Sequence, residues 1–235
     1  MKTSMIKKIA ICISASAMLT SFSATMASAA SVGGNYAKVS NSASVVSKAN
    51  KSKIAAKTAA AAKADAAAAK ANAGKAAYWI TIPGTFTMYQ QEKDNYCCDA
   101  CIKSVLMYTV NTSPSQATIH SNINLDFSKI PAYVNARESQ CYYVLVNGPS
   151  KSTLTSHIKS DCQTWKVPAF LRIYNTSGSN WYYATAGHCI IANGVMSDDS
   201  QIQLSDPLGG RVSGCPYFYK KNTSIVSGIT THMCW

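Results

Sequence analysis

The chain has 235 residues, 47% of them hydrophobic, and a formal net charge of +12. Most of this charge lies near the N-terminus: residues 1–29 carry +3, residues 30–76 carry +7, and residues 77–235 carry only +2. A nucleic-acid-binding domain carries its basic charge on the folded surface, so a nearly neutral folded part argues against a nucleic-acid partner. The length that remains after the basic segments is that of one ordinary domain.

Residues 1–29 have the layout of a secretory signal peptide. Three lysines precede an apolar stretch, which ends at the small-residue triplet Ala27-Ser28-Ala29. Ser and Thr interrupt this stretch, so it falls short of the about 20 apolar residues that a membrane span needs. We therefore expect cleavage after Ala29 and a soluble, secreted mature chain.

Residues 30–76 are rich in Ala and Lys. Ala favours helix formation, but almost no large apolar residue follows Ile54, so the segment lacks an apolar stripe that could dock on a core. It is interpreted as a solvated spacer or a pro-segment. Its basic charge also allows association with an anionic cell wall.

From residue 77 the composition changes to aromatic and β-branched residues, which indicates one domain over residues 77–235 and, we expect, a monomer. Apolar residues cover most of the circumference of a predicted buried helix from Cys97 to Val110, with Asp94 or Asn95 as its N-cap. Further helices are predicted from Ser115, over 130–137 and over 152–162, and strands over 141–146, 168–174, 187–194, 201–206 and 215–220. Helices followed by strands predict an α+β domain.

Of nine cysteines, one belongs to the signal peptide, and three of the remaining eight are Cys97, Cys98 and Cys101. In an exported chain, disulfides are the first expectation for most of them. The spacing of Cys98 and Cys101 also fits a zinc or redox pair, but no second such pair and no βαβ pattern accompany it, so no metal or other cofactor is expected. The third alternative is a nucleophile, because the start of a buried helix carries partial positive charge that favours a thiolate at Cys97.

His188 is the best placed of four histidines to act as the partner base. If residues on either side of the loop 193–201 pair symmetrically, Ala192 opposes Ile202 and His188 opposes Asp206. Directly opposed residues have Cβ atoms about 5 Å apart, close enough for a carboxylate to orient an imidazole. This register predicts a His188–Asp206 pair.

The chain carries Gln91, Asn95-Tyr96-Cys97, Gly187-His188 and Asp206-Pro207 in this order. The pattern resembles bacterial papain-like cysteine peptidases of the C39-like type, which are relatives of double-glycine leader peptidases. The likeness covers about residues 83–220. It implies a papain-like α+β fold, with the buried nucleophile helix on an antiparallel sheet, and a peptide or protein substrate.

The resemblance also implies a role for each of four residues. Cys97 attacks the scissile carbonyl, and His188 takes the thiol proton and later protonates the leaving amine. Asp206 holds the imidazole in the required tautomer. The side-chain amide of Gln91 donates to the oxyanion together with the backbone N–H of Cys97.

Cys98 and Asp99 stand where this family commonly has Gly-Pro. A carboxylate so close to Cys97 opposes thiolate formation unless Asp99 points away. Cys98 remains an alternative nucleophile, because helix starts are uncertain by a residue. The sequence thus leaves three functions: a secreted peptidase, a catalytically inactive binding module held by disulfides, and a cell-wall amidase or endopeptidase.

Overall fold

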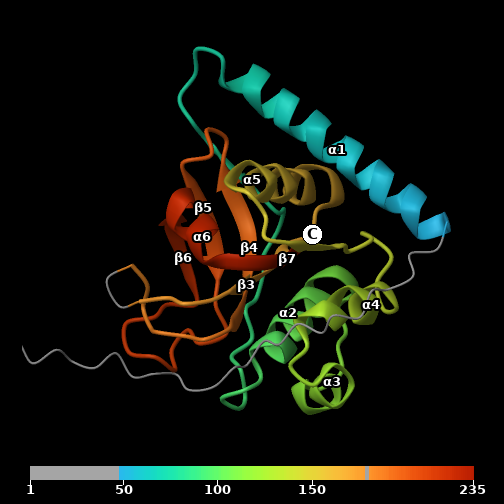
Figure 1. The fold of residues 1–235 in the computed structure, drawn as a ribbon, viewed down its shortest axis with the longest axis vertical. Coiled ribbons are helices and arrows are strands. Elements are labelled where there is room, and N and C mark those ends of the chain that lie inside the picture. Colours follow the sequence, from blue (N-terminus) through green and yellow to red (C-terminus); the bar gives the residue numbers. More distant parts are fainter. Residues whose placement is uncertain (1–47, 178–179) are drawn as a thin grey trace, which may run out of the picture.

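The computed structural model describes residues 48–177 and 180–235. Within these residues, helices and one antiparallel seven-stranded sheet confirm the predicted α+β class (Figure 1). The strand order is β2-β7-β3-β4-β5-β6, and β1 pairs with the far end of β4. The strands are β1 (Trp79–Thr81), β2 (Leu145–Asn147), β3 (Ala169–Ile173), β4 (His188–Met196), β5 (Gln201–Ser205), β6 (Phe218–Asn222) and β7 (Thr230–Cys234). The helices are α1 (Lys48–Asn72), α2 (Cys97–Val110), α3 (Gln116–Ile123), α4 (Ile130–Asn135), α5 (Lys151–Ser160) and α6 (Thr223–Ile229), with a 3-10 turn η1 (Phe127–Lys129) and a π turn η2 (Asp161–Trp165).

The helix α2 has the predicted bounds and is buried along most of its length against β4. It ends at Asn111, which adopts the left-handed conformation that terminates many helices. The predicted N-cap is wrong: Tyr96 occupies the cap position and makes no side-chain capping bond. Asp94 instead pairs with Arg211.

The predicted central helices and strands form within a few residues of their expected bounds, whereas α6 and β7 were not predicted. The α6 segment contains Thr, Ser, Gly and Val, which are weak helix formers, so neither propensity nor periodicity indicates it. Its start is fixed locally by Asn222, whose side chain accepts a bond from the Ser224 N–H at 2.8 Å. The strand β7 lies between β2 and β3, and both of these neighbours are distant from β7 in the sequence.

The predicted pairing of β4 with β5 is wrong by two residues. Ala192 pairs with Leu204 rather than Ile202, and the register shifts again around Asn193. At Gly194 the strand also pairs with Thr81 of β1, and a Cβ at Gly194 would lie 2.8 Å from the Thr81 Cγ2. An even shift keeps the sides of a strand unchanged, so residues predicted to share a face still share it.

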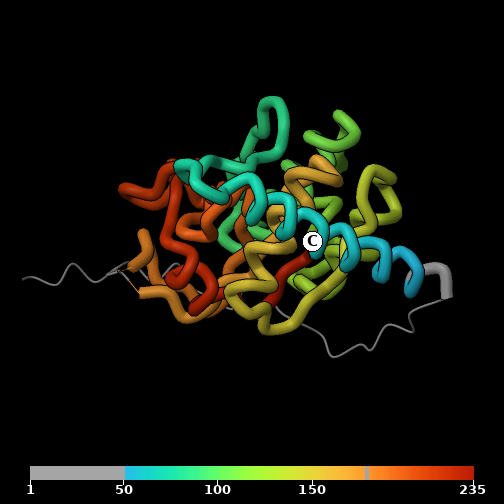
Figure 2. The backbone as a smooth tube through the Cα atoms, turned by 90° about the horizontal axis from the view of Figure 1, so that it is seen from above, coloured from blue at the N-terminus to red at the C-terminus, as the bar shows by residue number. Residues whose placement is uncertain are grey.

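The expectation of a solvated spacer is wrong for the part of that segment that forms α1. Figures 1 and 2 show α1 lying across α5 beside the C-terminus. Ala61, Ala64 and Ala68 are buried along one side of the helix, where their small side chains permit a close approach. Lys57 is only 1% exposed and forms an ion pair with Asp161 at 3.2 Å. An alanine stripe and one buried lysine thus replace the missing large apolar residues.

The predictions of a signal peptide over residues 1–29 and of a spacer over 30–47 lie outside the described residues. Of the helices that the structure describes, none combines the length and the apolar character needed to cross a bilayer.

Candidate active site

The structure brings three of the four predicted site residues together. Cys97 is the first residue of α2, His188 is the first residue of β4, and Asp206 directly follows β5. The His188 Nε2 lies 3.0 Å from the Asp206 Oδ1, and the Cys97 thiol interacts with the His188 ring. Because Nε2 faces the carboxylate, Nδ1 is the ring nitrogen left for the thiol. The three groups therefore stand in the order thiol, imidazole, carboxylate.

Asp206 is held by more partners than the sequence predicts. Its Oδ2 accepts hydrogen bonds from the hydroxyl groups of Tyr183 and, at 2.8 Å, of Tyr219. Its Oδ1 accepts from the Leu208 N–H at 2.9 Å as well as from His188. Four donors satisfy a carboxylate that has no exposed surface, so the site keeps Asp206 ionised and fixed in orientation.

The two tyrosines were missed because their positions depend on long-range pairing. Tyr219 pairs with Leu204 across the β5–β6 ladder, which places it beside the end of β5 and hence near Asp206. Tyr183 comes from the segment before β4 and stands edge-on to the His188 ring, with 5.3 Å between ring centroids. No local motif marks either residue.

Burial and the opposite charge of the partner compete in setting the pKa values of His188 and Asp206. Burial opposes the charge on His188, but the facing Asp206 carboxylate outweighs it and raises the pKa of His188 to about 10. Burial likewise opposes the Asp206 charge, but His188 and the tyrosine donors outweigh it and hold the pKa of Asp206 below its ordinary value. At neutral pH the pair is an imidazolium and a carboxylate.

The Cys97 thiol is subject to opposing influences. Complete burial raises the pKa of Cys97 well above its ordinary value, and the thiol of Cys98 raises it further. The His188 contact acts in the opposite direction, because a positive imidazolium favours a neighbouring thiolate. The site thus supplies the counter-charge that a thiolate needs, while its closed state keeps the thiol protonated.

Gln91 does not direct its amide hydrogens at the oxyanion position in this conformation. Its Nε2 donates to the carbonyl oxygens of Lys93 and Asp94, each at 2.9 Å, so both amide hydrogens are engaged in the loop before α2. Its backbone N–H donates to the Pro207 carbonyl at 3.0 Å. These contacts hold the loop, and the oxyanion role of Gln91 stays a prediction.

Asp99 pairs with a histidine on another helix. Its Oδ2 lies 2.8 Å from the Nδ1 of His120 on α3, and the His120 ring stacks on Tyr96. Burial raises the pKa of Asp99 to about 6, while His120 acts in the opposite direction. His120 is thus the polar partner of a buried carboxyl group that stands two residues after Cys97.

The expected disulfides are absent from the described residues, in which all eight cysteines are buried free thiols. Nor does any group of three or more His, Cys, Asp or Glu side chains stand ready to hold a metal ion in residues 48–177 and 180–235.

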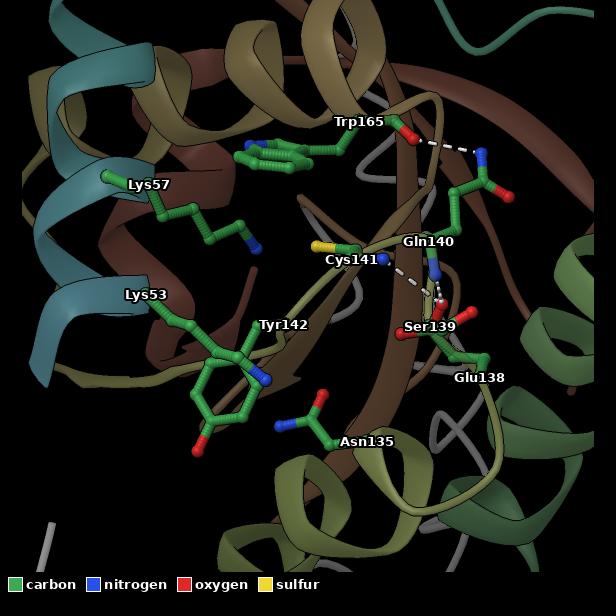
Figure 3. A pocket seen from close by; sticks show the side chains of 10 residues that line it. Lys53, Lys57, Asn135, Glu138, Ser139, Gln140, Cys141, Tyr142 and Trp165 are labelled. Atoms are coloured by element: carbon green, nitrogen blue, oxygen red, sulfur yellow. Dashed lines mark hydrogen bonds between the residues drawn. The ribbon is translucent and has the colours of Figure 1, made fainter. Parts of the chain in front are cut away.

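The candidate site is closed to solvent, since Cys97 and Asp206 have no exposed surface and His188 is 2% exposed. A pocket of about 300 Å³ lies elsewhere, between α1 and the segment 138–142. Figure 3 shows Lys57 reaching from α1 into this pocket toward Cys141. A peptide can therefore reach the Cys97 sulfur only if the structure around it opens.

Comparison with solved structures yields a likeness of fold. No family model and no curated protein matches the chain. The fold is similar to the crystal structure of xylellain, a cysteine protease from Xylella fastidiosa, with 12% sequence identity and a TM-score of 0.46. The match covers 66% of this chain and 84% of that chain, and likeness at this level carries no inference about chemistry. The class that the fold and site define is an α+β protein with a buried Cys–His–Asp arrangement.

Proposed function

We propose that this protein is a secreted cysteine peptidase of the papain-like, C39-like type, which hydrolyses peptide bonds. One observation carries the proposal: the Cys97 thiol at the start of a buried helix contacts an imidazole whose other nitrogen faces the Asp206 carboxylate. This is the nucleophile, base and orienting group that acyl transfer requires.

In the proposed reaction, the Cys97 sulfur attacks the peptide carbonyl and forms a thioester as the amine leaves. Because His188 is already an imidazolium at neutral pH, Cys97 loses its proton to solvent when the site opens, and the resulting thiolate is paired with the charged ring. The His188 Nδ1–H then donates its proton to the leaving amine, and the neutral ring accepts a proton from the water that hydrolyses the thioester. Asp206, held by Tyr183 and Tyr219, keeps the ring oriented and stabilises its positive form. The first N–H groups of α2 lack helical acceptors and carry partial positive charge, which suits them to the oxyanion.

Export and location belong to the same proposal. Residues 1–29 direct secretion, and the mature chain acts as a monomer without a nucleic-acid partner. The exposed lysines of α1, among them Lys51, Lys63 and Lys70, support association with an anionic cell wall.

A second candidate function is a catalytically silent binding module. The full burial of Cys97 and the engaged amide of Gln91 favour it, because both oppose turnover in this conformation.

Hydrolysis assays separate the candidates. The purified mature chain is incubated with a fluorogenic peptide library and, in parallel, with purified peptidoglycan. A peptidase cleaves peptides, loses this activity in Cys97→Ala and keeps it in the control Cys141→Ala, whose thiol lines the distant pocket. Fragments released from peptidoglycan alone indicate the cell-wall enzyme. No cleavage of either substrate indicates the silent module.

A further inference from the structure

Three buried thiols meet where α2 packs against β4. Cys98 lies one turn before Cys101 on the same side of α2, and the thiols of both residues interact with the thiol of Cys189. The Cys101 thiol also donates to the Cys189 carbonyl oxygen at 3.3 Å. None of the three side chains has exposed surface, and all belong to free cysteines in the structure. Close thiols in a chain with an export signal have the opportunity to form a cystine.

The positions of these thiols connect them with the candidate active site. Cys98 directly follows Cys97 in α2, and Cys189 directly follows His188 in β4. A covalent bond between Cys98 and Cys189 would therefore tie the element that carries the nucleophile to the element that carries the base.

We propose that Cys98 and Cys189 form a disulfide in the exported protein and that Cys97 stays a free thiol. The two thiols together lose two protons and two electrons, and an external disulfide such as oxidised glutathione accepts them and becomes two thiols. The bond forms by attack of one cysteine thiolate on a mixed disulfide of the other. Because the folded structure closes these groups off, the exchange takes place while the chain folds.

Local geometry favours Cys98 over its neighbours. The Cys101 thiol already has an acceptor in the Cys189 carbonyl, so it is satisfied as a buried thiol. Cys97 is engaged with His188. A bond between Cys97 and Cys98 would distort the first turn of α2, because successive helical residues project in different directions.

The bridge has a consequence for the nucleophile that rests on the proposed function. In the reduced protein, the Cys98 thiol is one of the groups that hold the pKa of Cys97 high. A cystine sulfur carries neither a proton nor a charge, so this contribution disappears on oxidation.

Peptide mapping tests the bridge without reference to activity. The mature chain is refolded in a glutathione redox buffer, denatured in acid, blocked with N-ethylmaleimide, and digested with trypsin and Asp-N. Trypsin releases residues 94–103, and Asp-N cuts before Asp99, which separates Cys98 from Cys101. We expect fragment 94–98 to be cross-linked to the fragment 173–197, which contains Cys189.

Variants assign the bond within fragment 94–98. The cross-link should persist in Cys97→Ala and vanish in Cys98→Ala. A cross-link through fragment 99–103, one that requires Cys97, or none in the unsubstituted chain would overturn the proposal. Because the map needs no substrate, an inactive protein that carries the cross-link would refute only the proposed peptidase.

Discussion

Replacing Asp206 with Asn should remove a pH-dependent part of the stability of the fold. The Asp206 carboxylate faces His188 at 3.0 Å and accepts three further hydrogen bonds. An asparagine amide has no charge and only one accepting oxygen, so in the variant only the smaller Cys97 contribution opposes the effect of burial on the imidazole. Burial lowers the pKa of His188, and the ring becomes neutral at neutral pH.

The magnitude follows from the pKa of His188, which is about 10 against an ordinary 6.5. At 1.36 kcal/mol per pH unit, this difference corresponds to about 5 kcal/mol, an order-of-magnitude figure. Because the pKa is higher in the folded chain than in the unfolded chain, the stabilisation is fully present below about pH 6.5. It is lost as the pH rises toward about 10.

Urea unfolding of both proteins between about pH 6 and pH 10 measures this contribution. We expect the wild type to exceed Asp206→Asn in unfolding free energy by several kcal/mol at the acidic end, and the gap to narrow steadily toward the alkaline end. The control Asp198→Asn removes an exposed turn carboxylate and should show no such trend. A gap that stays constant over this range would refute the charged His188–Asp206 pair.

Two further substitutions test the packing of α1 and β4. Lys57→Ala should destabilise the fold by about 3–5 kcal/mol in thermal or urea unfolding, because it leaves Asp161 buried without its ion-pair partner. The control Lys63→Ala removes an exposed lysine of the same helix and should change the unfolding free energy little. Equal effects of the two substitutions would contradict the packing of α1 on the domain. Gly194→Ala should cost about 1–3 kcal/mol, because its Cβ would meet the Thr81 Cγ2 at 2.8 Å. Adding Thr81→Ser removes that methyl group and should restore part of the loss, and no restoration would contradict the steric cause.

Local pattern was sufficient for the nucleophile helix. The spacing of apolar residues predicted both ends of α2 correctly, because the buried positions of a helix recur in the sequence with the period of the helix. The order of Cys97, His188 and Asp206 likewise pointed to groups that the structure brings into contact. The predicted pairing of β4 with β5 was wrong by two residues near His188. Because this shift is even, His188 and Asp206 still lie on the same face of the sheet.

What could not be predicted depends on residues distant in sequence. The register of β4 against β5 shifts beside Gly194, where β1, more than 100 positions earlier in the chain, also pairs with β4. The hydroxyl groups that hold Asp206 come from Tyr183 and Tyr219, which only the folded sheet brings together. The docking of α1 escaped notice because alanines and one paired lysine bury it, a pattern that resembles a solvated helix.

The central claim is that the sulfur of Cys97 is the reactive thiol of a Cys–His–Asp site. Mass-spectrometric mapping of a peptidyl vinyl sulfone on the native protein tests it most directly. We expect one adduct, on Cys97, which persists in Cys98→Ala, disappears in Cys97→Ala and forms far more slowly in His188→Ala. An adduct on Cys98, or labelling that appears only after denaturation, would contradict this claim.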